Sequence, residues 1–224
     1  MDIRNLRPAT EFAQNFGIKA IVYGPPGSSK TPTINTAPRP VLLACEPGLL
    51  SMRGSQVPTY QAFDARSLDE FFAWLFNSNE TKAFDTVGID SISQMAEIYL
   101  IDAKRNNKHG LKAYGEMAEN SLKHLEKLFY MPYKHTYLIA KESSTNDNGI
   151  VQRRPYFPGQ QLPTEVPHKF DCILRLAIHN VPGVGQTKAF RCQGSLEEMA
   201  RNRTGTLNEF EEPDFGALIK KAMM

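Results

Sequence analysis

Short apolar runs alternate with amphipathic stretches along this chain, and that alternation limits the folds open to it. The apolar runs predict strands at 19–23, 41–45, 86–89 and 135–140. Apolar residues recur at helical spacing in the stretches 68–76, 93–103 and 113–129. Strands separated by helices form a parallel sheet, because each helix carries the chain back over the sheet before the next strand begins. The sequence therefore predicts an α/β fold with a mostly parallel central sheet flanked by helices.

Length, charge and cysteine content fit one domain of this class. The chain has 224 residues and a net charge of +2, so a nucleic-acid contact would need a local basic patch. Its three cysteines are odd in number and widely spaced, which is typical of neither a disulfide framework nor a zinc site. No apolar run reaches the length of about 18 residues that a membrane helix needs. These features predict a single domain over 1–224 in a reducing compartment, the cytoplasm, with no membrane contact.

The run Gly24-Pro25-Pro26-Gly27-Ser28-Ser29-Lys30-Thr31 directly follows the first predicted strand. It matches the phosphate-binding form G-x-x-x-x-G-K-[ST], in which small residues let backbone N–H groups face the phosphates of a nucleotide. Lys30 would bring a positive charge to the β- and γ-phosphate oxygens of ATP, and the Thr31 hydroxyl would bind Mg²⁺. Pro32 suits the first turn of a following helix. Ser29 stands where the form has glycine. If this position needs a positive φ, serine costs on the order of 1 kcal/mol of strain, which we interpret as a loss of affinity and not as a loss of the site.

Charged residues follow three of the predicted strands at their carboxyl ends. In a parallel sheet these ends meet at one edge, where ligands bind. Asp90 closes the third strand and would hold the Mg²⁺, as the acid at this place does in P-loop nucleoside triphosphatases. Glu46 closes the second strand and would orient and deprotonate the attacking water. Lys141 and Glu142 close the fourth strand, and since neighbours alternate faces only one should point at the γ-phosphate; we assign this role to Lys141.

Five motifs stand in a fixed order along about 18–207: G-P-P-G-S-S-K-T, V-L-L-A-C-E-P-G, T-V-G-I-D-S-I-S, H-T-Y-L-I-A-K-E and A-R-N-R-T-G. In this order and spacing they resemble the motifs of the RecA-like P-loop ATPases. More narrowly, the chain is similar to the small Sak-type ATPases of phages, which take part in recombination and single-strand annealing. The resemblance implies a RecA-like P-loop core that uses ATP and Mg²⁺, with Lys30, Thr31, Asp90 and Glu46 in the roles given above. It also implies the cytoplasm of a phage host as the location.

The last motif carries Arg201 and Arg203. It is similar to the K-N-R-x-G element of DnaB-type hexameric helicases, whose basic residues reach the γ-phosphate bound by the neighbouring subunit, although Arg201 replaces the usual lysine. A P-loop site at a domain edge leaves the γ-phosphate open on one side, where an arginine from a neighbour can bind. We therefore expect a homo-oligomer, a ring or a filament, whose ATP site is shared between subunits. Without the resemblance, two arginines in a solvated turn would be an equal interpretation.

The segment 143–167 has neither helical nor strand periodicity, so we expect a mobile loop. Arg153, Arg154, Tyr156 and Phe157 place two cations and two aromatic rings within it. Proteins hold single-stranded DNA through such cations and through bases stacked on aromatic rings. In RecA-like proteins the DNA-binding loop follows the strand of the γ-phosphate sensor, so we predict that these four residues bind single-stranded DNA. A second basic stretch, 104–109, either belongs to the same surface or only aids solubility.

Together these features predict an ATPase that acts on single-stranded DNA in phage recombination or replication. A phage single-strand-binding or annealing protein would be a further partner, and a C-terminal helix over 208–224 would follow the core. Two alternatives stay open. A nucleotide-gated DNA-binding module with little hydrolysis would agree with Ser29, and a P-loop kinase for small molecules would use 143–167 as a lid.

Overall fold

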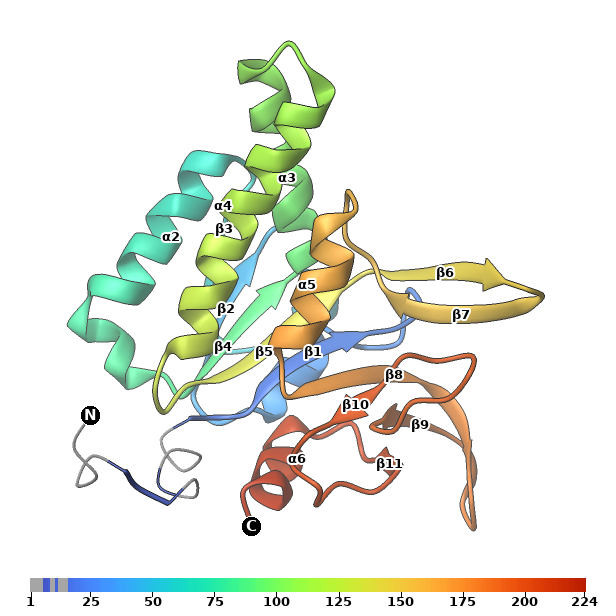
Figure 1. Ribbon diagram of the computed structural model, residues 1–224. Helices are drawn as coiled ribbons and strands as arrows, with labels where there is room; N and C mark the ends of the chain where they lie inside the picture. Colours follow the sequence, from blue (N-terminus) through green and yellow to red (C-terminus); the bar gives the residue numbers. More distant parts are fainter. Residues whose placement is uncertain (1–5, 9–10, 12–15) are drawn as a thin grey trace.

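The computed structural model describes residues 6–8, 11 and 16–224 (Figure 1). Its centre is a nine-stranded sheet with the order β11-β9-β8-β1-β5-β4-β2-β3, and β10 pairs with β8 off this path. The parallel part consists of β1 (Lys19–Tyr23), β2 (Pro40–Ala44), β3 (Thr59–Gln61), β4 (Thr86–Asp90), β5 (His135–Ala140) and β8 (Cys172–Val181). Three antiparallel strands complete it: β9 (Gly185–Arg191), β10 (Arg201–Asn202) and β11 (Phe210–Glu211). The predicted α/β fold with a mostly parallel sheet is confirmed.

Helices cover both faces of this sheet (Figure 1). One face carries α2 (Ala65–Asn77), α3 (Ile92–Asn106), α4 (Gly110–Tyr130) and α5 (Gln161–Lys169). The other carries the 3₁₀ turn η2 (Pro32–Thr36) and α6 (Phe215–Ala222). Two short 3₁₀ turns, η3 (Leu50–Met52) and η4 (Asn79–Ala83), lie in connections. Among the residues described, none of the helices has the length and apolar character needed to cross a membrane.

The period-2 geometry of the strands divides the core into two hydrophobic clusters. In β1, Ile21 and Tyr23 pack in the cluster under α2, α3 and α4, whereas Ala20 and Val22 pack in the cluster under η2 and α6. Strands buried on both faces read as continuous apolar runs, which is why the sequence revealed them. The arrangement places the carboxyl ends of β1, β2, β4 and β5 along one edge of the sheet.

The segment 143–167, expected as a loop, forms regular secondary structure, and its mobility stays a prediction. It forms an antiparallel hairpin of β6 (Glu142–Asp147) and β7 (Ile150–Pro155), followed by most of α5. The two-residue turn is Asn148-Gly149, with φ of 50° and 86°. Positive φ at both positions is typical of the type I′ turn that suits a hairpin. Figure 1 shows this hairpin extending away from the sheet, and because it packs little apolar surface its strands lack the alternation that predicts them.

Candidate nucleotide-binding site

The loop 24–31 leaves the end of β1 at the edge where the parallel strands terminate. Gly24 lies very close to β8: a Cβ at this position would be 2.1 Å from the carbonyl oxygen of Leu176. Only glycine permits this approach. Gly27 turns the chain with a φ of 77°. Ser29 has a φ of 70°, so the position does require the left-handed conformation, and serine is strained there by about 1 kcal/mol or more. A 3₁₀ turn, η2, follows this loop in place of the expected α-helix.

Lys30 folds back into the loop. Its Nζ donates to the carbonyl oxygens of Gly24 at 2.8 Å and Pro25 at 2.9 Å, and to Ser28 Oγ at 3.3 Å. Burial lowers the Lys30 pKa, and the nearby charges of Asp90, Glu142 and Glu46 act in the opposite direction. The ammonium therefore lies inside the loop, held by neutral carbonyls that a charged phosphate could replace.

Thr31 and Asp90 come together below the loop. Thr31 Oγ1 donates to Asp90 Oδ2 at 2.6 Å. Burial raises the Asp90 pKa, Glu46 raises it further, and the hydrogen bond from Thr31 and the charge of Lys30 lower it. Glu46 lies beside them, because its Oε1 accepts a hydrogen bond of 2.8 Å from Ser91 Oγ. Ser91 also caps α3 by accepting from the backbone N–H of Gln94, so the helix start fixes the acidic cluster.

These oxygens fit a small, hard cation. Mg²⁺ takes hydroxyl and carboxylate oxygens, keeps several waters, and is completed by substrate phosphates. The Thr31 hydroxyl and the buried Asp90 carboxylate are of this kind. Within the described part of the chain, no group of three or more His, Cys, Asp and Glu could hold a metal by itself. These two protein ligands thus suit a metal whose remaining ligands come from water and from the phosphates of a nucleotide.

Lys141 does not contact the loop in the described structure. Its Nζ donates to Gln94 Oε1 at 2.7 Å and to Glu97 Oε2 at 2.9 Å, both on α3. The charge of its neighbour Glu142 acts on Lys30 together with those of Asp90 and Glu46, and Glu142 is paired with Arg175 at 2.7 Å. The Lys141 side chain is held on α3 in this structure, and its contact with the γ-phosphate stays a prediction.

Arg201 and Arg203 lie at the opposite edge of the sheet. Arg201 pairs with Ile173 at the start of β8, which runs parallel to β1, whereas the loop 24–31 follows the end of β1. Arg201 Nη2 donates to the carbonyl oxygens of Phe170, at 2.6 Å, and of Pro167. The exposed Arg203 donates to the carbonyl oxygen of His168 at 2.8 Å. Neither arginine reaches the loop of its own chain.

The four residues predicted to bind DNA separate into two kinds. Arg153 and Arg154 lie half-buried on β7, and Tyr156 is half-buried just after it. Phe157 is 4% exposed and packs in the core, so its ring is not available to a base and its predicted stacking role is wrong. The backbone next to it is fixed, because Ser93 Oγ donates to the Tyr156 carbonyl at 2.6 Å and accepts from the Lys141 N–H at 3.0 Å.

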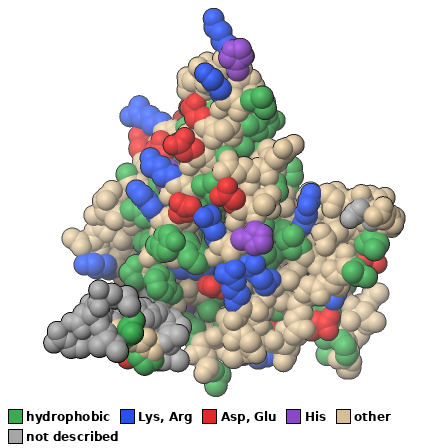
Figure 2. All heavy atoms as spheres, in the orientation of Figure 1, with side chains coloured by type: hydrophobic (Ala, Val, Ile, Leu, Met, Phe, Trp, Pro, Cys, Tyr) green, Lys and Arg blue, Asp and Glu red, His purple; other side chains and the backbone are tan. Residues whose placement is uncertain are grey.

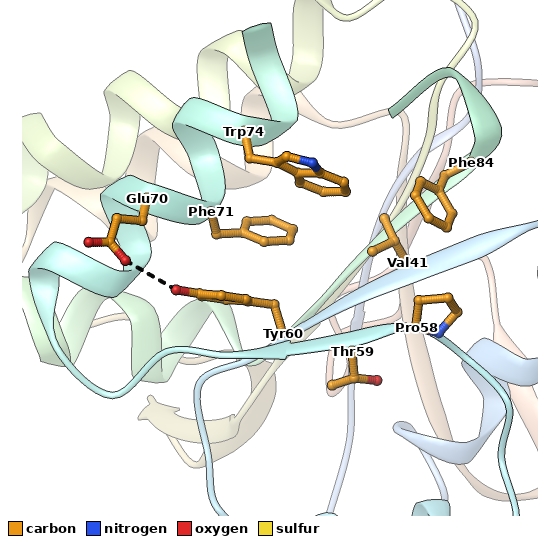
Figure 3. Close-up of a pocket in the computed structure, with 8 residues that line it drawn as sticks. All are labelled: Val41, Pro58, Thr59, Tyr60, Glu70, Phe71, Trp74 and Phe84. Carbon is orange, nitrogen blue, oxygen red and sulfur yellow. Dashed lines mark hydrogen bonds between the residues drawn. The ribbon is translucent and has the colours of Figure 1, made fainter. Parts of the chain in front are cut away.

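Two further surfaces lie outside the loop 24–31. The tip of the α3–α4 pair carries exposed Lys, Arg and His side chains, as Figure 2 shows, and includes the basic stretch 104–109. A pocket of about 470 Å³ lies between β3 and α2 (Figure 3), and its apolar walls include Tyr60, Phe71, Trp74 and Phe84. None of the residues that line this pocket belongs to the loop 24–31.

Two residues at the edge of the loop were missed by sequence reasoning. Lys188 of β9 donates from Nζ to Ser29 Oγ at 2.7 Å. Arg175 of β8 bonds both Glu142 and Glu198 at 2.7 Å. The signal for Lys188 was its place two positions before the buried Phe190, which puts both on one face of a strand. No local signal placed that face against the loop.

Comparison with known proteins gives a family match and distant structural likenesses. A family model described as an AAA domain, AAA_24, matches residues 17–204. No curated protein sequence matches the chain. Among solved structures, the chain is similar to a KaiC-like protein from the hyperthermophilic archaeon Pyrococcus horikoshii OT3, with 13% identity over 88% of this chain and 82% of that chain and a TM-score of 0.48. A likeness of this degree says nothing about activity.

Proposed function

Because this chain belongs to the AAA domain family, whose model matches it over 17–204 and which contains P-loop ATPases, we propose that it binds ATP with Mg²⁺ at the loop 24–31 and hydrolyses it. The observation that carries the proposal is the Thr31–Asp90 hydrogen bond of 2.6 Å, which joins the end of the loop 24–31, next to Lys30, to the end of β4. It brings a hydroxyl, a carboxylate and an ammonium to one place from two separate strands. The loop, the strand-end acid and the lysine are the parts that phosphoryl transfer uses.

Each of these residues has a defined task in hydrolysis. Lys30 exchanges its loop carbonyls for the β- and γ-phosphate oxygens. Thr31 and Asp90 would hold Mg²⁺, which would neutralise negative charge on the phosphates. Glu46, oriented by Ser91, accepts a proton from the water that attacks the γ-phosphate.

The position of Arg203 supports a site shared between subunits. Because Arg201 and Arg203 lie at the edge opposite the loop, they can act only on a nucleotide bound by another copy. We propose a homo-oligomer, a ring or a filament, in which Arg203 of one subunit binds the γ-phosphate held by its neighbour. An arginine that is supplied in trans makes hydrolysis depend on assembly.

Action on single-stranded DNA is a further part of the proposal. Arg153, Arg154 and Tyr156 lie at the root of a hairpin that extends from the same edge of the sheet as the loop 24–31. Cations bind the phosphate backbone and aromatic rings stack on bases. Phage recombination or replication, with a single-strand-binding or annealing protein as partner, is the setting that the resemblance to Sak-type ATPases suggests.

Steady-state ATP turnover, with and without single-stranded DNA, tests the catalytic proposal. Lys30→Ala should lower turnover by about 100-fold or more, since it removes the positive charge that stabilises the phosphates in the transition state. Lys220→Ala, an exposed lysine on α6, is the matched control and should leave turnover unchanged. Turnover of Lys30→Ala within twofold of the wild type would contradict the proposal that the loop 24–31 takes part in ATP hydrolysis.

Mixing experiments test the shared site. Arg203→Ala should abolish hydrolysis and spare nucleotide binding, and mixing it with Lys30→Ala protein should restore part of the turnover. Mixed subunits form some sites with an intact loop and an intact arginine. The absence of any rescue would contradict sharing.

A second candidate is a nucleotide-gated DNA-binding module with little hydrolysis. The strained φ of 70° at Ser29 favours it, since a distorted loop can bind phosphates without aligning them for attack. It predicts DNA binding that depends on ATP, with no turnover above background in the presence of DNA. Turnover that rises with added DNA would exclude it.

A further inference from the structure

A second lysine reaches the loop 24–31 from a distant part of the chain. Lys188 Nζ donates to Ser29 Oγ at 2.7 Å, and both side chains are half-buried. Among the described residues, no carboxylate lies within ion-pair distance of Lys188. The charge of this lysine therefore faces the loop without a counter-ion.

The sheet register fixes this contact. Lys188 pairs with Ile178 on β8, and β8 pairs with β1, from which the loop begins. Phe190, two positions further along β9, is buried in the cluster that also contains Ile34 of η2. Alternate residues of a strand share a face, so Lys188 projects on the side where the loop turns into η2.

The pair Lys188–Ser29 has the chemistry of an anion-binding site. The Ser29 oxygen accepts from the ammonium, so its own proton is free to be donated. Lys188 retains further N–H donors as well. A phosphate oxygen can accept from both groups, and such charge-assisted hydrogen bonds are about twice as strong as neutral ones.

We propose that Lys188 and Ser29 form a second phosphate contact of this loop, which binds the phosphate chain of the nucleotide in addition to Lys30. The inference rests on the proposed nucleotide binding. It gives Ser29 a purpose that glycine could not serve, because only a side chain can link β9 to the loop. The strain at φ 70° is then compensated by two ligand contacts instead of lowering the affinity.

Equilibrium binding of Mg-ATP, Mg-ADP and inorganic tripolyphosphate tests the proposal. Lys188→Met should weaken binding of all three by about tenfold or more, which is the usual effect of losing a charged hydrogen bond. Binding of adenosine, which has no phosphate, should not change with this substitution. Lys169→Met, which removes a half-buried lysine of α5 paired with Glu126, is the control and should bind as the wild type does.

The same substitution made in the Ser29→Gly variant shows whether Lys188 binds phosphate or only holds the loop in place. If Lys188 acts only by holding Ser29, Lys188→Met should have no effect when Ser29→Gly is already present. If Lys188 binds phosphate, a loss of about tenfold should persist in that background, and Lys188→Arg should retain most of the affinity. Urea unfolding of each variant shows that the protein is folded, and Lys188→Gln replaces Lys188→Met if the latter is not.

The outcomes distinguish this proposal from the proposed function. Tight binding by Lys188→Met together with loss of binding by Lys30→Ala overturns the role of Lys188 and leaves the ATP site intact. No effect of Lys188→Met in the Ser29→Gly background also overturns it. Failure of the wild type to bind any of the three ligands would overturn the proposed function itself.

Discussion

Arg175 joins two carboxylates in a buried cluster at the root of the β6–β7 hairpin. Its Nε bonds Glu142 Oε2 and its Nη1 bonds Glu198 Oε1, both at 2.7 Å. The three side chains are 8%, 16% and 11% exposed. We predict that Arg175→Met lowers the free energy of unfolding far more than the loss of an equally short ion pair that is more open to solvent.

The magnitude follows from which charges the substitution leaves unpaired. Breaking a buried pair costs about 3–5 kcal/mol, because the remaining charge stays out of water. Glu198 keeps Arg191 at 3.2 Å, so Glu142 is the carboxylate left without a partner, and the expected cost is about 3 kcal/mol. That is a large part of the roughly 5–15 kcal/mol that stabilises a domain.

The Lys169–Glu126 pair is the control. It has the same N–O distance of 2.7 Å, but its side chains are 29% and 46% exposed. Exposed pairs contribute about 0–1 kcal/mol, so Lys169→Met should cost no more than that. If burial sets the cost and distance does not, the two substitutions differ by about 2 kcal/mol or more.

Equilibrium unfolding in urea, followed by circular dichroism, measures both values under the same buffer. Adding Glu142→Gln to Arg175→Met should recover part of the loss, since it removes the unpaired charge. Equal losses for Arg175→Met and Lys169→Met would refute the reasoning, and so would a double variant that is less stable than Arg175→Met.

Three further predictions concern buried groups and the loop. Burial lowers the Lys19 pKa to about 8, so between pH 8 and 10.5 the unfolded chain holds a proton that the folded chain has released. As the pH rises through this range the wild type should therefore gain stability relative to Lys19→Met, which urea unfolding at each pH measures. Burial raises the Asp90 pKa, so its ionised form destabilises the fold at neutral pH, and Asp90→Asn should raise the melting temperature at pH 7 while Mg²⁺-dependent ATP binding is lost. Gly24→Ala should cost about 1–3 kcal/mol and weaken ATP binding because its Cβ meets the Leu176 carbonyl, whereas Gly27→Ala, with open space around it, should cost only about 1 kcal/mol in urea unfolding.

The sequence predicted the parts of this fold that are built from buried strands. The predicted runs 19–23 and 135–140 have the bounds of β1 and β5, because a strand covered on both faces is apolar over most of its length. The loop 24–31 was found for a related reason, since its glycines and its Lys30–Thr31 end are local requirements. The strand-end acids Asp90 and Glu46 followed from the topology of a parallel sheet.

Elements without a buried apolar face were not predicted. The β6–β7 hairpin has polar residues on both sides, and only its Asn148-Gly149 turn carries a signal for it. The helix expected after the loop is limited to η2, because β-branched and Asn residues are poor helix formers and Pro38 lies two residues after its end. The burial of Phe157 and the contact of Lys188 depend on residues far away in the sequence, so no local pattern indicates them.

The Ser93 hydroxyl joins three parts of the molecule at one point. It lies in the first turn of α3, just after the Asp90 strand, and it bonds the backbone on both sides of the hairpin root, at Lys141 and Tyr156. A hairpin clamped in this way has no independent hinge. Any rigid-body swing of its two strands has to be shared with the start of α3, which directly follows Asp90, so the projecting hairpin and this carboxylate are mechanically coupled.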